Sequence, residues 1–392
     1  MRIRLHCLDG LRGLAALYVV LFHEALNSDE APGTFSPLMS AVHALIYKGH
    51  FAVVFFIVLS GFSLMLPVAR SSTGELAGGL REFAKRRGRR ILPTYYAALA
   101  VSLLIIGSYS VLEPLLHLSR PKVEHIFEAG TLISHLTLVH NLSFAWAYKI
   151  NAPMWSVATE WQIYFIFALL LLPIWRRGGI MLAVLAAWVI GCLPHVLMSP
   201  EKNLSWAGPW LLGSFALGML GASIHFSAKY ADSWWRMRAP WGSFAAAAAA
   251  LTALVLGRPE AWNYIAVDAA VSVCALCIIN RCVVESTRPE ASGVWLKLFA
   301  SKPLVALGGF SYSLYLIQHP VLTIAKTLLN RLHMNRSANL ALELLVITPI
   351  TLAIAWLFAE LFERPFTSSG VLLPALRKRW GGASPAPASP PA

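Results

Sequence analysis

The stretch from Leu8 to Glu24, LDGLRGLAALYVVLFHE, constrains this chain more than any other. It is apolar enough to cross a membrane as a helix, yet it contains Arg12 and His23. Eleven steps of about 100° bring these two side chains back to one helical face, about 16 Å apart along the axis. An arginine in hydrocarbon costs roughly 2.5–3.5 kcal/mol, so such groups usually face a bundle interior or a polar cavity. We expect both side chains to face the interior at different depths. The alternative is that Arg12 snorkels to the headgroups and His23 is an interfacial anchor.

Composition favours an integral membrane protein. Hydrophobic residues make up 57% of the 392 residues and charged residues only 13%, whereas about a quarter of a soluble domain is charged. We therefore predict an all-α fold, a polytopic membrane helix bundle of about ten transmembrane helices. The expected spans are residues 8–27, 43–68, 91–112, 153–175, 180–198, 206–226, 240–257, 262–281, 303–329 and 340–361.

The placement of lysine and arginine predicts the orientation. Most of them fall in connections that lie on the same side as the N-terminus. The positive-inside rule then predicts a multi-pass protein of a bacterial inner membrane with both termini in the cytoplasm. This bias explains the net charge of +13 without a nucleic-acid partner. The N-terminus loosely imitates a signal peptide, but Asp9 and Arg12 interrupt it, so we expect a retained first span.

A run of basic residues precedes the third expected span. It contains Arg86, Arg87, Arg89 and Arg90, directly before Ile91. Anchoring by the positive-inside rule accounts for part of this run. Anchoring the two neighbouring spans would need fewer positive charges than this run contains, however. Guanidinium groups also match the geometry of phosphate oxygens. A cytoplasmic ligand with several phosphates fits this run, and lipid headgroups fit it too.

The fourth expected span places Glu160 within the membrane. Counted from the outer ends of their spans, Glu160 and His23 lie at similar depths, within about 5 Å. A carboxylate beside a histidine would orient its ring, as a general base requires. The alternative is a structural glutamate bonded to Trp155 or Tyr164. In the ninth span, His319 precedes a proline, and a packing role is as plausible as a working one.

The segment from about 113 to 152 is the longest outer connection, and we expect it to fold back on the bundle. It contains four histidines, but no carboxylate or cysteine stands at ligand spacing, so we expect no metal. The histidines are His117, His125, His135 and His140.

Several motifs resemble those of the integral-membrane acyltransferase superfamily three. They are LDGLRGLAALYVVLFH, FFIVLSGF, RRGRRILP, WSVATEWQIYF, LGGFSYSLYLIQHP and FERPF, in that order from about residue 8 to 366. Singly most are weak, but together they are highly specific. Two departures matter: Phe51-Ala52-Val53 stands where the family often has Gly-Val-Asp, and Glu160-Trp161 stands where it often has two acids. The resemblance implies a membrane acyltransferase domain over residues 1–366, followed by a cytoplasmic tail, 367–392, disordered after about residue 380.

Members of this superfamily acylate surface polysaccharides, lipopolysaccharide and the hydroxyls of macrolides and other small molecules. The resemblance therefore implies an acyl-CoA donor as co-substrate, no metal, and His23 as the catalytic residue. Arg12 and His23 are too far apart to touch one carbonyl, so Arg12 would hold the cytoplasmic part of the donor.

We hypothesise an O-acyltransferase that moves an acetyl or short acyl group to a hydroxyl of a carbohydrate or of a hydrophobic natural product such as a macrolide. Arg86, Arg87, Arg89 and Arg90 would bind the CoA phosphates, and His23 with Glu160 would deprotonate the acceptor. A transient acyl-histidine is less favoured. The alternative function is a multi-span transporter of a lipid-linked or anionic solute.

Overall fold

The computed structural model describes residues 5–116, 126–199, 202–256, 263–287 and 293–367. The predicted tail from 368 onward, His117 and His125 lie outside these ranges. The described part is helical and contains no strands. The helices of the first half are α1 (His6–Ser28), α2 (Pro37–Ile46), α3 (His50–Ala69), α4 (Gly79–Leu116), α5 (Ala129–Leu136), α6 (Phe144–Ala147), α7 (Met154–Ile166) and α8 (Leu172–Leu197).

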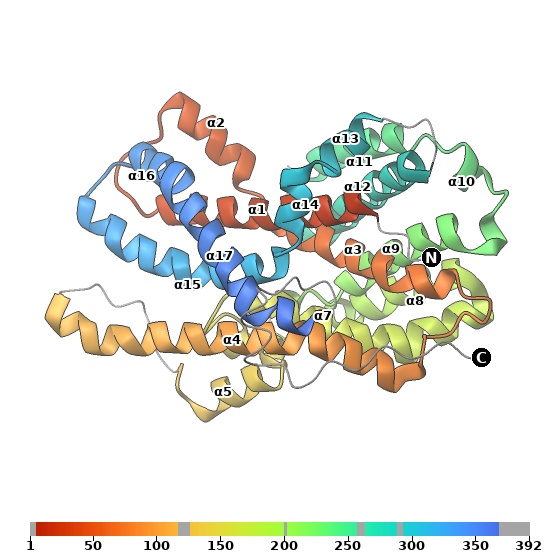
Figure 1. Cartoon of the computed structure of the whole chain (residues 1–392), viewed down its shortest axis with the longest axis horizontal. Coiled ribbons are helices and arrows are strands. Elements are labelled where there is room, and N and C mark those ends of the chain that lie inside the picture. The colour runs from red at the N-terminus through yellow and green to blue at the C-terminus, as the bar shows by residue number, and fades with distance from the viewer. Residues whose placement is uncertain (1–4, 117–125, 200–201, 257–262, 288–292, 368–392) are drawn as a thin grey trace, which may run out of the picture.

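The second half of the chain continues the bundle (Figure 1). Its helices are α9 (Leu211–Phe226), α10 (Trp234–Met237), α11 (Trp241–Leu256), α12 (Asn263–Thr287), α13 (Val294–Phe299), α14 (Lys302–Gly308), α15 (Ser311–Leu329), α16 (Arg336–Leu342) and α17 (Thr348–Phe362). A π-helical turn, Phe167–Leu171, joins α7 to α8, and a second one, Glu343–Ile347, joins α16 to α17.

Small residues bring the first helix close to its neighbour. A Cβ atom on Gly10 would stand 1.7 Å from the carbonyl oxygen of Phe299, and one on Gly13 would stand 2.4 Å from that of Leu304. Close approach of this kind is typical of helix pairs in membranes. The rotation of α1 about its axis is thereby fixed, which directs Arg12 away from α14 and into the bundle.

The core centres on α3, which packs most extensively on α9. Gly61 and Gly218 allow this contact, because a Cβ on either would stand 1.9 or 2.0 Å from a backbone oxygen of the other helix. The helix α15 packs against both α1 and α4 (Figure 1). Side chains of α1, α3, α4, α7 and α15 therefore meet inside the bundle.

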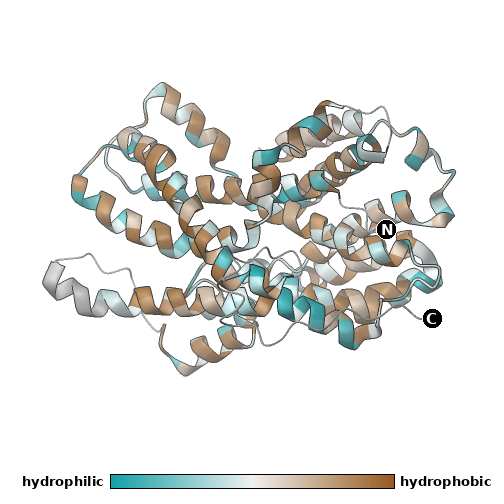
Figure 2. Ribbon diagram, in the orientation of Figure 1, coloured by the Kyte–Doolittle hydropathy of each residue, from teal (hydrophilic) through white to brown (hydrophobic). Residues whose placement is uncertain are grey.

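Six described stretches are long and apolar enough to cross a membrane: Pro37–Ala69, Gly79–Tyr109, Met154–Leu197, Ser205–Phe226, Tyr264–Thr287 and Arg336–Phe366. Met154–Leu197 turns at Gly179, whose φ of 81° interrupts the helix. The predicted all-α membrane bundle is confirmed, whereas the number of ten spans is not. Figure 2 shows hydrophobic residues along most helices and hydrophilic residues gathered at the first turns of α4.

Candidate active site

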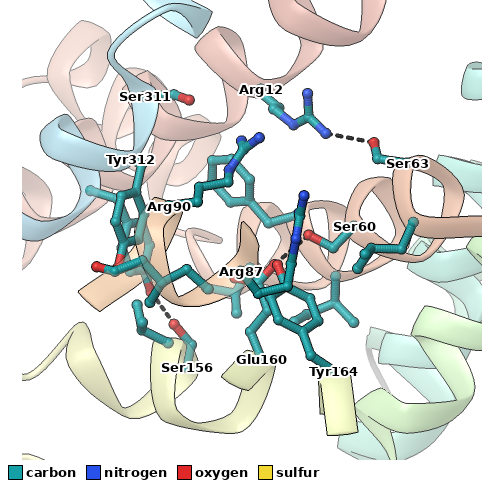
Figure 3. Close-up of a pocket in the computed structure, with 17 residues that line it drawn as sticks. Arg12, Ser60, Ser63, Arg87, Arg90, Ser156, Glu160, Tyr164, Ser311 and Tyr312 are labelled. Carbon is teal, nitrogen blue, oxygen red and sulfur yellow. Dashed lines mark hydrogen bonds between the residues drawn. The ribbon is translucent and has the colours of Figure 1, made fainter. Parts of the chain in front are cut away.

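A cavity of about 90 Å³ lies inside the bundle, where five helices meet. Its polar lining is drawn in Figure 3 and comes from α1, α3, α4, α7 and α15: Arg12, Ser60, Ser63, Arg87, Arg90, Ser156, Glu160, Tyr164, Ser311, Tyr312 and Tyr315. A space of this size holds about three water molecules or a small acyl group. The cavity is therefore a small interior site whose wall combines charged and hydroxyl groups with apolar side chains.

Three guanidinium groups point toward this cavity (Figure 3). Arg12 donates from Nη2 to Ser63 Oγ at 2.5 Å, and its Nη1 lies 3.6 Å from Asp9 Oδ1. The guanidinium carbon of Arg87 lies 6.0 Å from the centre of the Tyr164 ring. Arg90 belongs to the lining as well. The lining thus holds three guanidinium groups and one carboxylate, that of Glu160, and this excess of positive charge suits an anion such as phosphate.

The predicted arginine cluster divides into two pairs. Arg87 and Arg90, three positions apart, share the face of α4 that lines the cavity. Arg86 and Arg89 do not belong to the lining, and Arg86 donates to the carbonyl oxygen of Ala77 at 2.8 Å. This division follows from helical geometry, since residues three positions apart face the same way and adjacent residues do not.

Glu160 contacts α3 and its own helix. Its Oε1 accepts hydrogen bonds from Ser60 Oγ and, at 2.5 Å, from the hydroxyl of Tyr164. The sequence analysis expected Glu160 beside His23. The structure instead brings it to the arginine-lined cavity, with the Tyr164 partner that the alternative interpretation named.

The reason for this difference is the depth at which α7 begins. Asn151 is fully buried, and its Nδ2 donates to the carbonyl oxygen of Leu316 at 2.9 Å, in the second turn of α15. The segment before α7 therefore enters the bundle well below its end. Glu160 follows nine residues later, about 13 Å further along the axis, which brings it to the depth of Arg12.

His23 lies on the opposite half of α1, half-buried against α15. Its Nδ1 is 2.8 Å from the carbonyl oxygen of Val19. Because a carbonyl oxygen can only accept, Nδ1 carries the proton and Nε2 carries the lone pair that can act as a base. The ring of His319 stands 6.3 Å away, nearly perpendicular at 87°. The structure thus brings two histidines together that the sequence could not pair.

The arginine cavity ends one helical turn short of these histidines. Tyr315 lines the cavity four residues before His319, and its hydroxyl lies 2.6 Å from Ser156 Oγ. Arg12 and Glu160 therefore belong to one level of the bundle, and His23 and His319 to the next.

Comparison with known proteins shows the family to which the chain belongs. A family model described as "Acyltransferase domain", acyltransferase family 3, matches residues 5–360. The chain belongs to the acyltransferase-3 family. It is similar to O-acetyltransferase OatA of Staphylococcus aureus, 22% identical over 337 residues, which cover 82% of this chain and 51% of that protein. It is also similar to peptidoglycan O-acetyltransferase OatA of Listeria monocytogenes, 28% identical over 171 residues, which cover 42% of this chain and 24% of that protein.

The chain spans about half the length of the Staphylococcus aureus relative and about a quarter of the Listeria monocytogenes one. No solved structure matches the chain. The description of this acyltransferase-3 site therefore depends on the chain's own geometry.

Several residues of the site were not predicted. Ser63 contacts Arg12, 51 positions away in the sequence, and Ser156 contacts Tyr315, 159 positions away. No local sequence pattern can predict contacts between residues so widely separated in the chain. The contact of Tyr164 with Glu160 is different, because four positions on a helix place two side chains together.

Two of the four histidines in the segment from about 113 to 152, His135 and His140, lie in the described residues. The rings of His135 and His140 stack at 4.0 Å, 8° from parallel, and both are fully buried. Burial and the neighbouring His135 lower the pKa of His140 to about 3. Across the ranges that the structure covers, no three His, Cys, Asp or Glu side chains gather as metal ligands would.

Proposed function

We propose that this acyltransferase-3 protein is a membrane O-acyltransferase. It moves an acetyl or short acyl group from acyl-CoA to a hydroxyl of a carbohydrate or of a hydrophobic natural product such as a macrolide. The names of both relatives, which denote O-acetyl transfer, support the reaction type.

The observation that carries this proposal is the pair of adjacent levels inside the bundle. One level presents three guanidinium groups that can bind an anion. The next level contains the imidazole of His23, whose Nε2 can accept a proton. Acyl-CoA has phosphates at one end and a reactive thioester at the other, joined by a long, thin arm. Arg86 and Arg89 would meet the phosphates at the exposed end of α4, and Arg87, Arg90 and Arg12 would hold the donor where it enters the bundle.

The reaction needs one base and one later acid. His23 Nε2 removes the proton from the acceptor hydroxyl as its oxygen attacks the thioester carbonyl carbon. The C–S bond breaks, and the thiolate of CoA takes the proton back from His23, so protons balance. General base catalysis of this kind contributes about 10²–10⁴ in rate. Glu160 acts from the cavity level, where it fixes Ser60 and Tyr164 beside the arginines.

This proposal fixes an orientation. The basic first turns of α4 face the cytoplasm, where acyl-CoA is made, and both termini lie on that side of a bacterial inner membrane. The histidine level then faces outward, toward the acceptor.

The test is the release of free CoA thiol from acetyl-CoA by purified protein in lipid nanodiscs, with and without acceptor. His23→Gln should lower acceptor-dependent release by at least about 10²-fold. The matched control is His6→Gln, an exposed histidine in the first turn of the same helix, which should leave the rate unchanged. A folded His23→Gln protein with full turnover would refute the proposal.

The transporter alternative makes the opposite prediction. Solute flux into vesicles in the absence of CoA, without release of thiol, would decide for it. Membership of the acyltransferase-3 family favours the enzyme.

A further inference from the structure

A histidine with a buried carboxylate partner stands at the first turn of α3. His50, the first residue of α3, places its Nε2 2.8 Å from Asp268 Oδ2 on α12. The same oxygen accepts a hydrogen bond from Trp210 Nε1 of α9, also at 2.8 Å. The Asp268 side chain is 1% exposed, whereas that of His50 is 44% exposed. The carboxylate is thus a buried anchor, and the imidazole is its accessible end.

The geometry fixes which nitrogen of His50 is free. A carboxylate accepts, so Nε2 carries the proton that points at Asp268. Nδ1 is then the acceptor nitrogen of a side chain that is 44% exposed. The indole of Trp155 on α7 lies beside it, with ring centroids 6.2 Å apart and planes within 10° of parallel. An acceptor atom and two aligned ring faces are presented together.

His50 stands next to the proposed reaction path. Val53, one turn further along α3, and Ser156, adjacent to Trp155, both line the arginine cavity. On the other side, Gly49 packs directly on the ring of Phe22, since a Cβ there would stand 2.3 Å from it. Phe22 in turn meets the ring of His23 at 5.2 Å. The His50 turn therefore borders both the cavity and the His23 neighbourhood.

We propose that His50, anchored by Asp268 and flanked by Trp155, is the acceptor-binding site and that the acceptor is a sugar. This inference rests on the proposed function. Nδ1 of His50 accepts a hydrogen bond from a ring hydroxyl, while the C–H face of the pyranose lies on the aligned rings. A pyranose offers both features, an apolar face and a rim of hydroxyls, at the same place.

The experiment measures binding and turnover separately. Binding of chitopentaose to the nanodisc protein, without donor, is followed by calorimetry. Turnover is followed as release of CoA thiol from acetyl-CoA, at varied chitopentaose and, in a second arm, at varied erythronolide B. The variant His50→Gln keeps a donor for Asp268 but removes the imidazole, so its remaining acceptor, an amide oxygen, is displaced and no ring lies parallel to Trp155. Asp268→Asn removes the anchoring charge and leaves the ring.

The matched control is His43→Gln. His43 lies on α2 at the same end of the bundle, with its own carboxylate partner, Asp29 Oδ1, at 3.1 Å. It borders neither the cavity nor Trp155. Loss of this pair should leave chitopentaose binding and turnover unchanged.

The expected result is a rise of about tenfold or more in the chitopentaose Kd and KM for His50→Gln and Asp268→Asn, with an unchanged KM for acetyl-CoA. Unchanged sugar affinity in both variants, or a wild-type protein that turns over erythronolide B but does not bind chitopentaose, overturns the inference. The two proposals fail differently. Binding that depends on His50 in a protein that never releases CoA would contradict the acyltransferase proposal and leave the sugar site standing.

Discussion

The carboxylate of Glu160 has two hydroxyl donors and shares its cavity with three guanidinium groups. Glu160→Ala leaves the hydroxyls of Ser60 and Tyr164 without their acceptor in the bundle interior. Each unsatisfied buried group costs about 1–3 kcal/mol. We therefore expect a lower melting temperature for Glu160→Ala.

The comparison variant is Glu160→Gln, whose side-chain oxygen still accepts from both hydroxyls. It should keep most of the melting temperature and, with one negative charge removed among the arginines, bind CoA more tightly. Differential scanning fluorimetry and a CoA binding titration measure the two effects. Equal melting temperatures for the two variants would show that the hydroxyl contacts carry no stability.

The stacked pair His135 and His140 makes stability depend on pH. The pKa of His140 in the folded protein is about 3, below the value of about 6.5 of a free histidine. The unfolded chain thus binds a proton that the folded protein excludes. The contribution of His140 to the free energy of unfolding is therefore fully present above about pH 6.5 and decreases as the pH falls toward 3.

This effect is checked with His140→Phe, which retains a buried ring against His135. Between about pH 7 and pH 5, the melting temperature of the wild type should fall more steeply than that of His140→Phe. Parallel curves for the two proteins would assign the acid sensitivity to other groups.

At the scale of the element, the crossing of α3 and α9 depends on residues without side chains. A Cβ on Gly218 would stand 2.0 Å from the carbonyl oxygen of Val58, so the helices would have to separate. Overpacking of this kind costs about 1–3 kcal/mol. Gly218→Ala should therefore lower the yield of folded protein and its melting temperature, measured by fluorescence-detected size exclusion with a heating step.

A glycine in an open position provides the control. No atom lies within 4 Å of a Cβ built on Gly242 of α11, and alanine is the better helix former by roughly 1 kcal/mol. Gly242→Ala should be neutral or slightly stabilising. If both variants lose stability equally, close approach is not the cause.

The helices also show what the sequence can and cannot predict. Hydrophobic runs identify the apolar helices, and Arg12 and His23 lie on one continuous helix, α1, as the first expected span requires. The neighbours of Glu160 were beyond this reasoning, because a hydrophobic run does not reveal how deep its helix begins. Asn151, held by the carbonyl of Leu316, sets that depth through a contact between segments 165 positions apart. The pairing of His50 with Asp268, 218 positions apart, escaped detection for the same reason.

At the scale of the whole molecule, the orientation of the bundle in the membrane can be tested at two exposed threonines. Thr34 lies exposed between α1 and α2, and Thr73 lies exposed between α3 and α4, at opposite ends of α3. The distribution of lysine and arginine predicts that Thr34 faces outward and Thr73 the cytoplasm. In intact cells, a membrane-impermeant maleimide should label Thr34→Cys and not Thr73→Cys, with native cysteines replaced in both.

Permeabilised cells supply the control for this prediction, because both cysteines should then be labelled. If only Thr73→Cys were labelled in intact cells, the bundle would have the opposite orientation and the arginines would lie outside. In that case a cytoplasmic donor could not reach them.

The hydrogen bond between the hydroxyls of Tyr315 and Ser156 lies between the two reactive levels, on the path that the arm of acyl-CoA would take in the proposed function. A protein that hands a chemical group from one side of an energised membrane to the other would short-circuit the ion gradient if it left an open aqueous channel. Here the phenol and serine hydroxyls satisfy each other across the gap, so little remains to draw in a file of water. In the proposed function the donor arm has to part this pair to reach His23, and the pair would close again on its release, so the path would stay shut to ions between turnovers.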